Sequence, residues 1–568
     1  MLLTFDPERE CPRVILAAWL SVLAVAPALA QAPPSPPMPT VPPTYVLSEG
    51  ATGSFFDEDV LIANPNDATV SVTLTFSTEG GQQVVQQRSL PPRSRLTVHV
   101  DQVPGLENVA TSVQVRPATA VPLIVERSMF WDNTYYAGHT GTAVDSPSLD
   151  WFFAEGSQGG FFDTYILVIN PNPTPADVSF TFFREGEPAT TKTVTVGAST
   201  RLTLFAGDVP EIVNRSFGIA VHATQPIMAE RAMYFGSRPG RVWGGGTESA
   251  GVPAASTHWF LAEGATGSFF DTFILLSNPQ STPAQVQVKY LLDSGETITV
   301  PKTLAAGARL TTNVEAEADP RLRNAAFSTV VTSDVPVIAE RSMFWPGVVL
   351  PWGEGHNSFG VVDAGTSWGL SEGRAGGTQN FHTFILLANP EPTAAEVNVA
   401  FLRESGSPVL KTYTVAPTSR FNIDANAIDG LQNASFGALI QVTNHVPIIV
   451  ERSMYWDVGG LQFAAGTNAT GIRLPDLTEV VEQPAQIRII SFVGPSSFTP
   501  NPAPIAAGRT VAWKNDDSQT HRIVADDGSF DTGNIDGGAT SMAVTRPAGT
   551  VAYHCTIHPT MTGTITTP

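Results

Sequence analysis

The sequence has little cysteine, little basic charge and no long apolar segment after its first 30 residues. It has two cysteines, and Cys11 precedes an apolar run at 14–30. If this amino-terminal segment is removed, Cys555 is the only thiol and no intramolecular disulfide can form. No later stretch approaches the length of a transmembrane helix, so we expect no membrane insertion.

The apolar run is typical of an export signal. It reads "VILAAWLSVLAVAPALA" and ends in the small-residue pattern Ala28-Leu29-Ala30, which precedes many cleavage sites. We predict a signal peptide at 1–30 and an extended Pro-rich linker at 31–44. The mature protein is then exported, to the periplasm, the cell surface or the extracellular medium.

The scarcity of basic residues excludes two classes of partner. Lys and Arg number 31 against 52 Asp and Glu, and the formal net charge is -21. Nucleic acid and anionic membrane surfaces both require basic patches, so neither is an expected partner. Residues 486–568 contribute only about -1, with 5 basic and 6 acidic residues, so the acidity lies in the preceding part of the chain.

Familiar catalytic patterns are also missing. The chain shows no Ser-His-Asp or Cys-His catalytic arrangement, no phosphate-binding Gly-rich loop and no paired-carboxylate cleft. We therefore predict a binding or electron-transfer protein and not an enzyme.

Most of the chain consists of four copies of one unit. The phrase "FLAEGATGSFFDTFILLSNP" recurs with its glutamate at Glu49, Glu155, Glu263 and Glu372, and a second phrase of the type "VERSMFW" closes each copy. A period of about 106 to 109 residues is that of whole domains, not of solenoid repeats. The predicted domains are 45–150, 151–258, 259–367 and 368–471, followed by a linker at 472–485 and a last domain at 486–568.

Each repeat is predicted to be all-β. Short runs rich in β-branched and aromatic residues alternate with Asn-Pro and Gly turn signals, as in "TFILLSNP" and "AQVQVKYLL". Seven or eight strands in this length favour an immunoglobulin-like β-sandwich, and a propeller is the alternative. Residues 45–471 resemble tandem exported bacterial β-sandwich domains of unknown function. We expect a rod-like stalk, with a compact assembly as the alternative.

Polar residues that recur in the repeats have two interpretations. One is a ligand or calcium site in each domain, and the other is a structural ion pair made by the arginine of the second phrase. We favour the structural interpretation, because the fourth repeat has His382 in place of the aspartate of the first phrase. The arginines are Arg127, Arg231, Arg341 and Arg452, and the aspartates are Asp57, Asp163 and Asp271.

Aromatic residues open and close the repeats. They could form an exposed platform for glycans or peptides, or fill cores and contacts between domains, and we favour the second interpretation. The opening residues are Tyr45, Trp151, Trp259 and Trp368, and the closing residues are Trp131, Phe235, Trp345 and Trp456.

The last domain carries a metal-ligand pattern. "VAYHCTIHPTMTGTI" places Cys555, His558 and Met561 on one short loop between two strand-like runs, and His521 follows the run "TVAWKND". One thiolate, two imidazoles and a weak thioether are the ligands of blue copper, and they suit both Cu(I) and Cu(II). A multicopper oxidase would need further His-x-His pairs, and a binuclear centre a second cysteine on the loop. One type 1 copper ion is therefore predicted.

Residues 486–568 resemble a small cupredoxin of the plastocyanin and amicyanin type. The matching segments are "AAGRTVAWKNDD", "SFDTG", "PAGTVAYHCTIHPTM" and "GTITT". The resemblance implies a Greek-key β-fold, copper bound by His521, Cys555, His558 and Met561, and support from Asn515, which would tie the His521 loop to the ligand loop near Thr556. His554 is expected to be structural, and the acidic loop 526–538 to be a turn and not a calcium site.

Three functions follow as hypotheses. The first is electron transfer, with a redox protein partner docking near His558. The second is copper binding without a redox role. The third is an envelope adhesion or scaffold protein that makes cell-surface, protein or glycan contacts through its repeats. Electron transfer leads, because storage of copper would favour several thiolates.

Overall fold

The computed structural model describes residues 33–78, 81–236, 243–346, 352–477, 485–505, 510–545 and 549–566. Its regular structure is almost entirely β-strand, and its helical elements are 3-10 turns of three or four residues. The predicted all-β fold class is confirmed. The predicted signal peptide and residues 478–484 of the predicted linker lie outside the described residues. Across the described ranges, no helix combines the length and apolar character needed to span a bilayer.

The first repeat is a sandwich of two antiparallel four-stranded sheets, ordered β1-β6-β3-β4 and β5-β2-β7-β8. Along β3, buried side chains alternate with more exposed ones, as expected for a strand with one face on a core. The strands are β1 (Tyr45–Leu47), β2 (Phe56–Asn64), β3 (Val70–Thr78), β4 (Gln83–Leu90), β5 (Ser94–His99), β6 (Thr111–Pro117), β7 (Ile124–Trp131) and β8 (Gly138–Thr142).

The second and third repeats have the same arrangement, but one long strand replaces the pair β6 and β7. These strands, β15 and β22, are 21 and 19 residues long, and each pairs with strands of both sheets. The second repeat comprises β9 (Ser148–Phe153), β10 (Ser157–Gln158), β11 (Phe162–Asn170), β12 (Ala176–Arg184), β13 (Thr190–Val196), β14 (Thr200–Phe205), β15 (Arg215–Phe235) and β16 (Gly245–Ala250). The third comprises β17 (Ser256–Leu261), β18 (Asp271–Asn278), β19 (Ala284–Leu292), β20 (Thr297–Leu304), β21 (Ala308–Asn313), β22 (Phe327–Trp345) and β23 (Glu354–Phe359).

The fourth repeat again has separate strands, and its two sheets are ordered β27-β26-β29-β24-β32 and β28-β25-β30-β31. The short strand β32, which follows the repeat, adds to the edge of the first of these sheets. The strands are β24 (Ser367–Leu370), β25 (His382–Asn389), β26 (Ala395–Arg403), β27 (Val409–Val415), β28 (Ser419–Asp424), β29 (Phe436–Val442), β30 (Ile449–Val458), β31 (Leu461–Thr470) and β32 (Ile472–Arg473).

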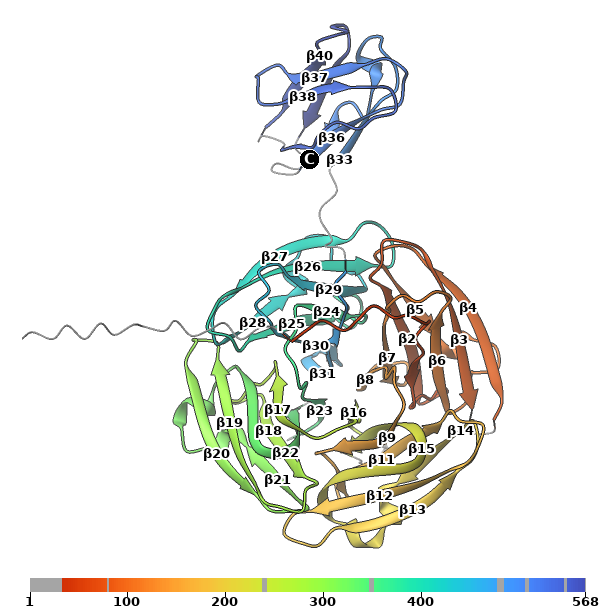
Figure 1. The fold of residues 1–568 in the computed structure, drawn as a ribbon, viewed down its shortest axis with the longest axis vertical. Coiled ribbons are helices and arrows are strands. Elements are labelled where there is room, and N and C mark those ends of the chain that lie inside the picture. Colours follow the sequence, from red (N-terminus) through yellow and green to blue (C-terminus); the bar gives the residue numbers. More distant parts are fainter. Residues whose placement is uncertain are drawn as a thin grey trace, which may run out of the picture.

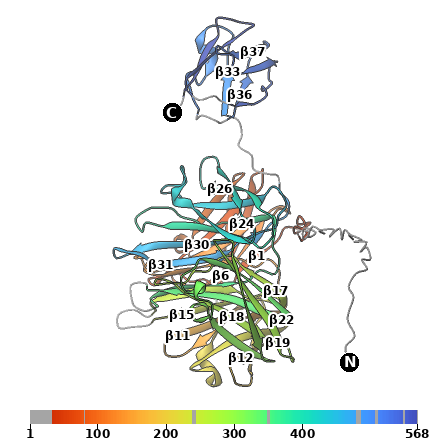
Figure 2. The same ribbon diagram turned by 90° about the vertical axis from the view of Figure 1, so that its left-hand side faces the viewer.

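The four repeats form a closed ring, which Figure 1 shows face-on and Figure 2 from the side. The last strand of each repeat lies at the centre, where β8 packs on β16, β16 on β23, β23 on β31 and β31 on β8. Glycine permits this close approach: a Cβ atom on Gly246 of β16 would lie 2.8 Å from the indole of Trp131 in the first repeat. The expected rod-like stalk is therefore wrong, and the compact alternative describes the repeats.

A buried arginine joins each repeat to the next. Its guanidinium donates to the backbone carbonyl of the glutamate in the first phrase of its own repeat and to the carboxylate of the "ER" glutamate in the next repeat. This supports the structural interpretation of the arginines, although the partner carboxylate comes from a neighbouring domain. The four pairs are Arg127–Glu230 (3.3 Å), Arg231–Glu340 (2.8 Å), Arg341–Glu451 (2.7 Å) and Arg452–Glu126 (2.5 Å), and the last of them closes the ring.

The last domain has two sheets of its own, ordered β34-β33-β36-β39 and β35-β41-β40-β37-β38. Trp513 fills its core, with ring centroids 5.0 Å from Phe530 and 5.3 Å from Tyr553. The strands are β33 (Ala485–Ile489), β34 (Phe498–Thr499), β35 (Ala503–Pro504), β36 (Thr510–Asn515), β37 (His521–Ala525), β38 (Asp531–Ile535), β39 (Val544–Thr545), β40 (Val551–Cys555) and β41 (Thr562–Thr566).

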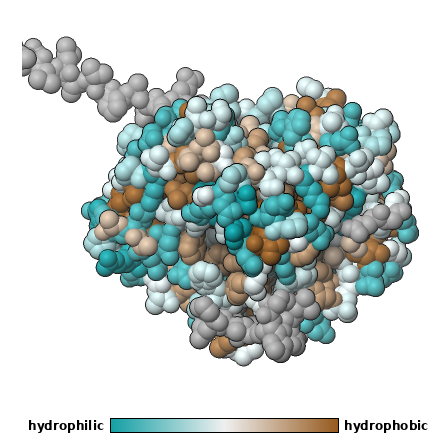
Figure 3. All heavy atoms as spheres, turned by 90° about the horizontal axis from the view of Figure 1, so that it is seen from below, coloured by the Kyte–Doolittle hydropathy of each residue, from teal (hydrophilic) through white to brown (hydrophobic). Residues whose placement is uncertain are grey.

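The surface of the ring is mixed in polarity. Figure 3 shows one face on which hydrophilic side chains predominate and hydrophobic ones form small separate patches. The Pro-rich segment before β1 is anchored to the segment that follows the ring: Arg473 donates to the Pro34 carbonyl at 3.0 Å, and Ser35 donates to Asp476 at 2.6 Å. The first described residues are thus held at the edge of the fourth repeat.

Candidate metal centre

Two paired strands bring the predicted ligands together. His521 is the first residue of β37, Cys555 is the last residue of β40, and the two strands pair with Ile523 opposite Cys555. The loop after β40 folds back on itself, because the Met561 N–H donates to the His558 carbonyl and the Cys555 N–H donates to the Met561 carbonyl. This tight turn carries His558 back to His521 at the beginning of β37.

The three strongest donor atoms form a compact triangle. The Cys555 Sγ lies 3.7 Å from the Nδ1 atom of His521 and 3.8 Å from that of His558, and the two Nδ1 atoms are 3.3 Å apart. An ion at the centre would lie about 2.1 Å from each atom, and metal–nitrogen and metal–sulfur bonds measure roughly 2.0–2.3 Å. The triangle therefore has the size of a single metal site.

The donor set also selects among metals. One sulfur and two imidazole nitrogens in a triangle are typical of copper electron-transfer sites, in which a methionine lies farther away on the axis. Met561 is fully buried in the same core cluster as Cys555, at the end of the ligand loop. The residues present thus fit copper, and a soft thioether is available beside them.

An acidic residue that the sequence did not single out orients one ligand. The Asp517 carboxylate lies 2.9 Å from the Nε2 atom of His521, on the side of the ring opposite the donor triangle. A carboxylate on the second ring nitrogen fixes the orientation of an imidazole and leaves Nδ1 free to bind metal. The spacing of four residues in "DSQTH" is the only signal for this contact in the sequence.

Asn515 and Thr556 support the site separately. The Asn515 side chain donates to the carbonyls of Gln519 and Ile535 and accepts from the Asp517 N–H, so it holds the turn before His521. The Thr556 N–H instead donates to the Arg522 carbonyl at 2.9 Å. These hydrogen bonds of the Asn515 side chain thus go to the turn before His521 and to β38, whereas Thr556 bonds to β37, and the predicted tie between the two loops through Asn515 stays a prediction.

The site has one partly exposed ligand. His521 and Cys555 are fully buried, whereas His558 is half-buried and its ring centroid lies 5.9 Å from that of Phe492. Phe492 is itself 48% exposed, and so are its neighbour Val493 (65%) and Ile557 beside the ligand (46%). This apolar rim could not be predicted from the sequence, because residues 490–493 are far from the ligand loop along the chain.

The other acidic and histidine residues of this domain are engaged elsewhere. His554 points away from the triangle and contacts the Asp526 carboxylate at 2.6 Å. In the loop 526–538, Asp531 pairs with Arg522, and Asp527 accepts from the Ser529 N–H. The hydrogen bond from Arg522 lowers the pKa of Asp531 to about 2. These contacts agree with the expected turn and with a structural His554.

The recurring aspartates of the repeats have a structural partner. In each of the first three repeats, the carboxylate accepts a hydrogen bond from an aromatic side chain that follows the "ERSM" strand. The pairs are Tyr135–Asp57 (2.8 Å), Trp243–Asp163 (3.0 Å) and Trp352–Asp271 (2.5 Å). The role of these aspartates is therefore to hold an aromatic side chain, a partner that the repeated phrases do not predict.

The aromatic residues that open and close the repeats are buried, which supports their interpretation as core and contact residues. Each has at most 6% of its surface exposed. They are Tyr45, Trp151, Trp259, Trp368, Trp131, Phe235, Trp345 and Trp456.

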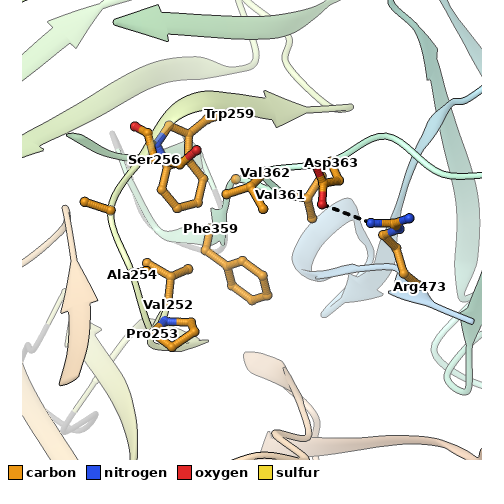
Figure 4. Close-up of a pocket in the computed structure, with 12 residues that line it drawn as sticks. Val252, Pro253, Ala254, Ser256, Trp259, Phe359, Val361, Val362, Asp363 and Arg473 are labelled. Carbon is orange, nitrogen blue, oxygen red and sulfur yellow. Dashed lines mark hydrogen bonds and ion pairs between the residues drawn. The ribbon is translucent and has the colours of Figure 1, made fainter. Parts of the chain in front are cut away.

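A pocket of about 420 Å³ lies between the segment that connects the second and third repeats (252–256) and the segment that connects the third and fourth (359–363), and Figure 4 shows its lining. Trp259, Phe359 and Val361 give it an apolar wall. Its charged residues, Asp363 and Arg473, pair with each other at 3.1 Å, and Arg473 also holds Pro34. The pocket therefore offers little unpaired polarity for chemistry, and we do not place the functional site there.

Comparisons with known proteins find similarity over small parts of the chain. No family model and no curated protein sequence matches it. A purple cupredoxin from Nitrosopumilus maritimus is 29% identical over 15% of this chain and 99% of its own, with a TM-score of 0.14. The Cu(I) form of a mutant of amicyanin is 21% identical over 16% and 87%, with a TM-score of 0.14. A Thermotoga maritima protein is 14% identical over 19% and 94%, with a TM-score of 0.17.

Proposed function

We propose that the last domain binds one type 1 copper ion and transfers electrons between redox proteins. The observation that carries this proposal is the triangle formed by the Sγ of Cys555 and the Nδ1 atoms of His521 and His558. Met561 serves as the weaker fourth ligand, because its thioether ends the same loop and is fully buried. Bound copper supplies one-electron oxidation and reduction.

The protein contributes a rigid, dry ligand frame. Cys555 and His521 lie on paired strands, and Asp517 holds the ring of His521 from behind. Ligands fixed by a sheet and by a supporting hydrogen bond move little when the charge of the site changes. Burial of the thiolate also keeps water and other thiols from reaching the sulfur.

Electrons enter and leave through His558, the ligand that reaches the surface. Around it, Phe492, Val493 and Ile557 offer an apolar rim, and the domain carries little net charge. Such a surface favours a partner that presents a complementary apolar patch over one guided by charge, and it favours brief encounters. We therefore place the redox partner at this rim.

Spectroscopy of the full chain with one equivalent of Cu(II) tests the copper site. We expect an intense visible band from thiolate-to-copper charge transfer and a narrow copper hyperfine splitting in the electron paramagnetic resonance spectrum. Cys555→Ser should abolish the band while the circular dichroism of the repeats stays unchanged. A colourless, ordinary tetragonal copper spectrum in the unaltered protein would overturn the proposal.

A second variant tests the axial role of Met561. Met561→Leu should keep the visible band and raise the reduction potential, because the axial ligand tunes the metal more than it holds it. The potential is measured by redox titration of the visible band. A potential equal to that of the unaltered protein would show that Met561 is not a ligand.

Copper binding without a redox partner is the alternative function, and the ligand set supports both. Electron exchange with a small redox reagent separates them: a carrier should be reduced and reoxidised rapidly without loss of metal. Replacing Phe492 with Glu should slow exchange with a protein partner but leave the potential nearly unchanged. Release of copper on each reduction would instead favour a binding role.

Export of the protein and the absence of catalytic activity are further parts of the proposal. The amino-terminal apolar run supports export, and fractionation of cells that express the full chain tests it. In this location the acidic ring would serve as an envelope scaffold that carries the copper domain, with contacts to surface proteins or glycans.

A further inference from the structure

Each repeat packs one planar side chain against the aromatic residue near the end of its "ERSM" strand. The planar group comes from the segment that follows this strand, five to nine residues after the strand residue along the sequence. Ring centroids are 4.6 Å apart for Tyr135 and Phe130, 4.4 Å for Trp243 and Tyr234, 5.1 Å for Trp352 and Phe344, and 5.6 Å for Phe463 and Tyr455.

At the interface of the first and second repeats, the indole of Trp243 sits in a cage of four aromatic rings, one of which is Phe55 of the first repeat at 5.9 Å. It stacks on Tyr234 at an interplanar angle of 19°, and it contacts Phe56 of the first repeat at 6.5 Å and Tyr165 of the second at 6.1 Å. The next interface is built alike: Trp352 stacks on Phe344 at 27° and lies 5.7 Å from Phe273. Indole thus occupies this cage at two of the four interfaces.

The interface of the fourth and first repeats also holds a planar group. Here the Arg374 guanidinium lies over the Phe130 ring at 4.8 Å and over the Phe381 ring at 5.4 Å. Asp59 pairs with it at 2.6 Å from the first repeat. The equivalent of the indole at this interface is Tyr135, whose ring centroid lies 4.6 Å from that of Phe130 and whose hydroxyl donates to Asp57, and Arg374 packs beside the same ring.

The interface of the third and fourth repeats keeps the cage but has no indole in it. Tyr455 lies 5.8 Å from Phe270 and 6.3 Å from Phe384, which repeats the geometry of Tyr234 with Phe56 and Tyr165. Phe463 is tilted by 41° against Tyr455 and does not stack on it. A cavity of about 220 Å³ remains between these rings.

The fourth repeat also differs at the residue that accepts a hydrogen bond from the aromatic occupant in the other three repeats. The fourth repeat has His382 where the other repeats have the aspartate that accepts from Tyr135, Trp243 or Trp352. Phenylalanine has no donor for such an acceptor, and Phe463 packs edge-on against the His382 ring at 5.0 Å. The fourth repeat thus has neither an occupant that donates a hydrogen bond nor the acceptor for it, and its cage is open.

We infer that this cage, formed by Phe270, Phe384 and Tyr455 and bordered by Phe463, binds a small planar aromatic molecule of about the size of indole. A cavity of about 150 Å³ with apolar walls is enough to hold benzene, so about 220 Å³ suits one or two fused rings. Met343 and Leu386 complete the apolar wall. Offset stacking and edge-to-face contacts with three rings favour an aromatic ligand over an aliphatic one.

The charges beside the cage favour a neutral ligand over a cation. The Glu263 carboxylate in the wall is already paired with Arg341 at 2.9 Å, and it accepts hydrogen bonds from Ser453 and Tyr455. Arg420, also in the wall, adds a positive charge at the same end of the cavity. A cationic guest would therefore meet no unpaired carboxylate there, in contrast to Arg374, which has Asp59.

Calorimetric titration of the full chain with indole tests the inference. We expect one indole per chain, with no measurable binding of tetramethylammonium at the same concentrations. Phe463→Trp should fill the cage and weaken indole binding at least tenfold. Leu461→Trp, on the same hairpin at an exposed position, is the matched control and should bind as the unaltered protein does.

Two further variants keep the test decisive. Trp352→Phe should open the equivalent cage between the second and third repeats and raise the stoichiometry to two. Ala326→Leu narrows the cavity from its opposite wall and should also weaken binding if Phe463→Trp fails to fold. Absence of indole binding to the unaltered chain up to millimolar concentrations, or equal binding by the Phe463→Trp variant, would overturn the inference.

Discussion

At the residue scale, the metal site depends on chemistry that is local in the sequence. Cys555, His558 and Met561 fall within seven residues, so their convergence could be predicted from a single tight turn. Asp517 could not be predicted in the same way. Its carboxylate reaches His521 only because the turn between β36 and β37, held by the Asn515 side chain, brings the two residues together, and Asp516 beside it is an equally good candidate by sequence.

Asp517 gives the first residue-scale prediction. Asp517→Ala should weaken copper binding about 10- to 100-fold, because the His521 ring loses the carboxylate that fixes its orientation. Asp516→Ala is the matched control, since Asp516 pairs with Arg488 on the surface at 2.5 Å. Competition with a copper chelator measures both affinities. Equal losses in the two variants would contradict an orienting role.

Glu58 gives a second prediction. It is buried in the first repeat, its carboxylate oxygens have no hydrogen-bond partner among the described residues, and burial raises its pKa to about 8. In the unfolded chain Glu58 ionises near pH 4.5, so the free energy of unfolding should fall as the pH rises from about 4.5 to 8. The total change is a few kcal/mol, since each pKa unit corresponds to about 1.4 kcal/mol.

The other repeats supply the control for Glu58. They have threonine at this position, and the hydroxyl donates to a backbone carbonyl, as Thr383 does to Arg374. Glu58→Thr should therefore be more stable than the unaltered protein at pH 8 and should lose this part of the pH dependence. Denaturant unfolding at pH 5 and pH 8 measures the difference. A parallel pH dependence in both proteins would show that Glu58 is not the group responsible.

At the scale of elements, the sequence identifies the strands better than it identifies their partners. The "ERSM" phrase predicts a buried strand with an ion pair, and β7, β15, β22 and β30 contain it. The identity of the carboxylate could not be predicted, because each repeat offers a glutamate of its own and an identical one in its neighbour. Only the packing of consecutive repeats decides that Arg341 pairs with Glu451 of the next repeat as well as with Glu263.

The pair that closes the ring gives the element-scale prediction. Glu126 in β7 accepts from Arg452 in β30 and from the N–H groups of Ser371 and Glu372, all of them buried. Glu126→Ala should lower the free energy of unfolding by about 3–5 kcal/mol, because it leaves a buried guanidinium without its partner.

Asp363 provides the comparison for Glu126. Its carboxylate also pairs with an arginine, Arg473, but it is half exposed. Asp363→Ala should therefore cost less than about 1 kcal/mol. Urea unfolding of both variants tests the contrast, and a similar small loss in both would show that the ring does not depend on its closing pair.

At the scale of the whole molecule, closure of the ring is what the sequence least reveals. Repetition predicts similar domains, and it fits a rod and a ring equally well, because the angle between neighbours is not encoded in either phrase. The angle is set by contacts such as that of Trp131 with Gly246 and by a second arginine, as when Arg309 of β21 donates to the Ala154 carbonyl of the preceding repeat. Each of these contacts joins residues of two repeats, so neither contact can be predicted from the sequence of one repeat.

A closed ring should unfold as one unit, and removal of one repeat tests this. A fragment ending at residue 367 leaves Arg341 without Glu451 and Glu126 without Arg452, and it exposes the central strands β8 and β23. We expect its melting temperature by differential scanning calorimetry to fall well below that of a fragment ending at residue 477, which keeps all four repeats. The longer fragment should melt as the ring does in the full chain. If the three-repeat fragment melts within a few degrees of the four-repeat fragment, each repeat is stable by its own core. The contacts among the central strands then only arrange domains that would fold without them.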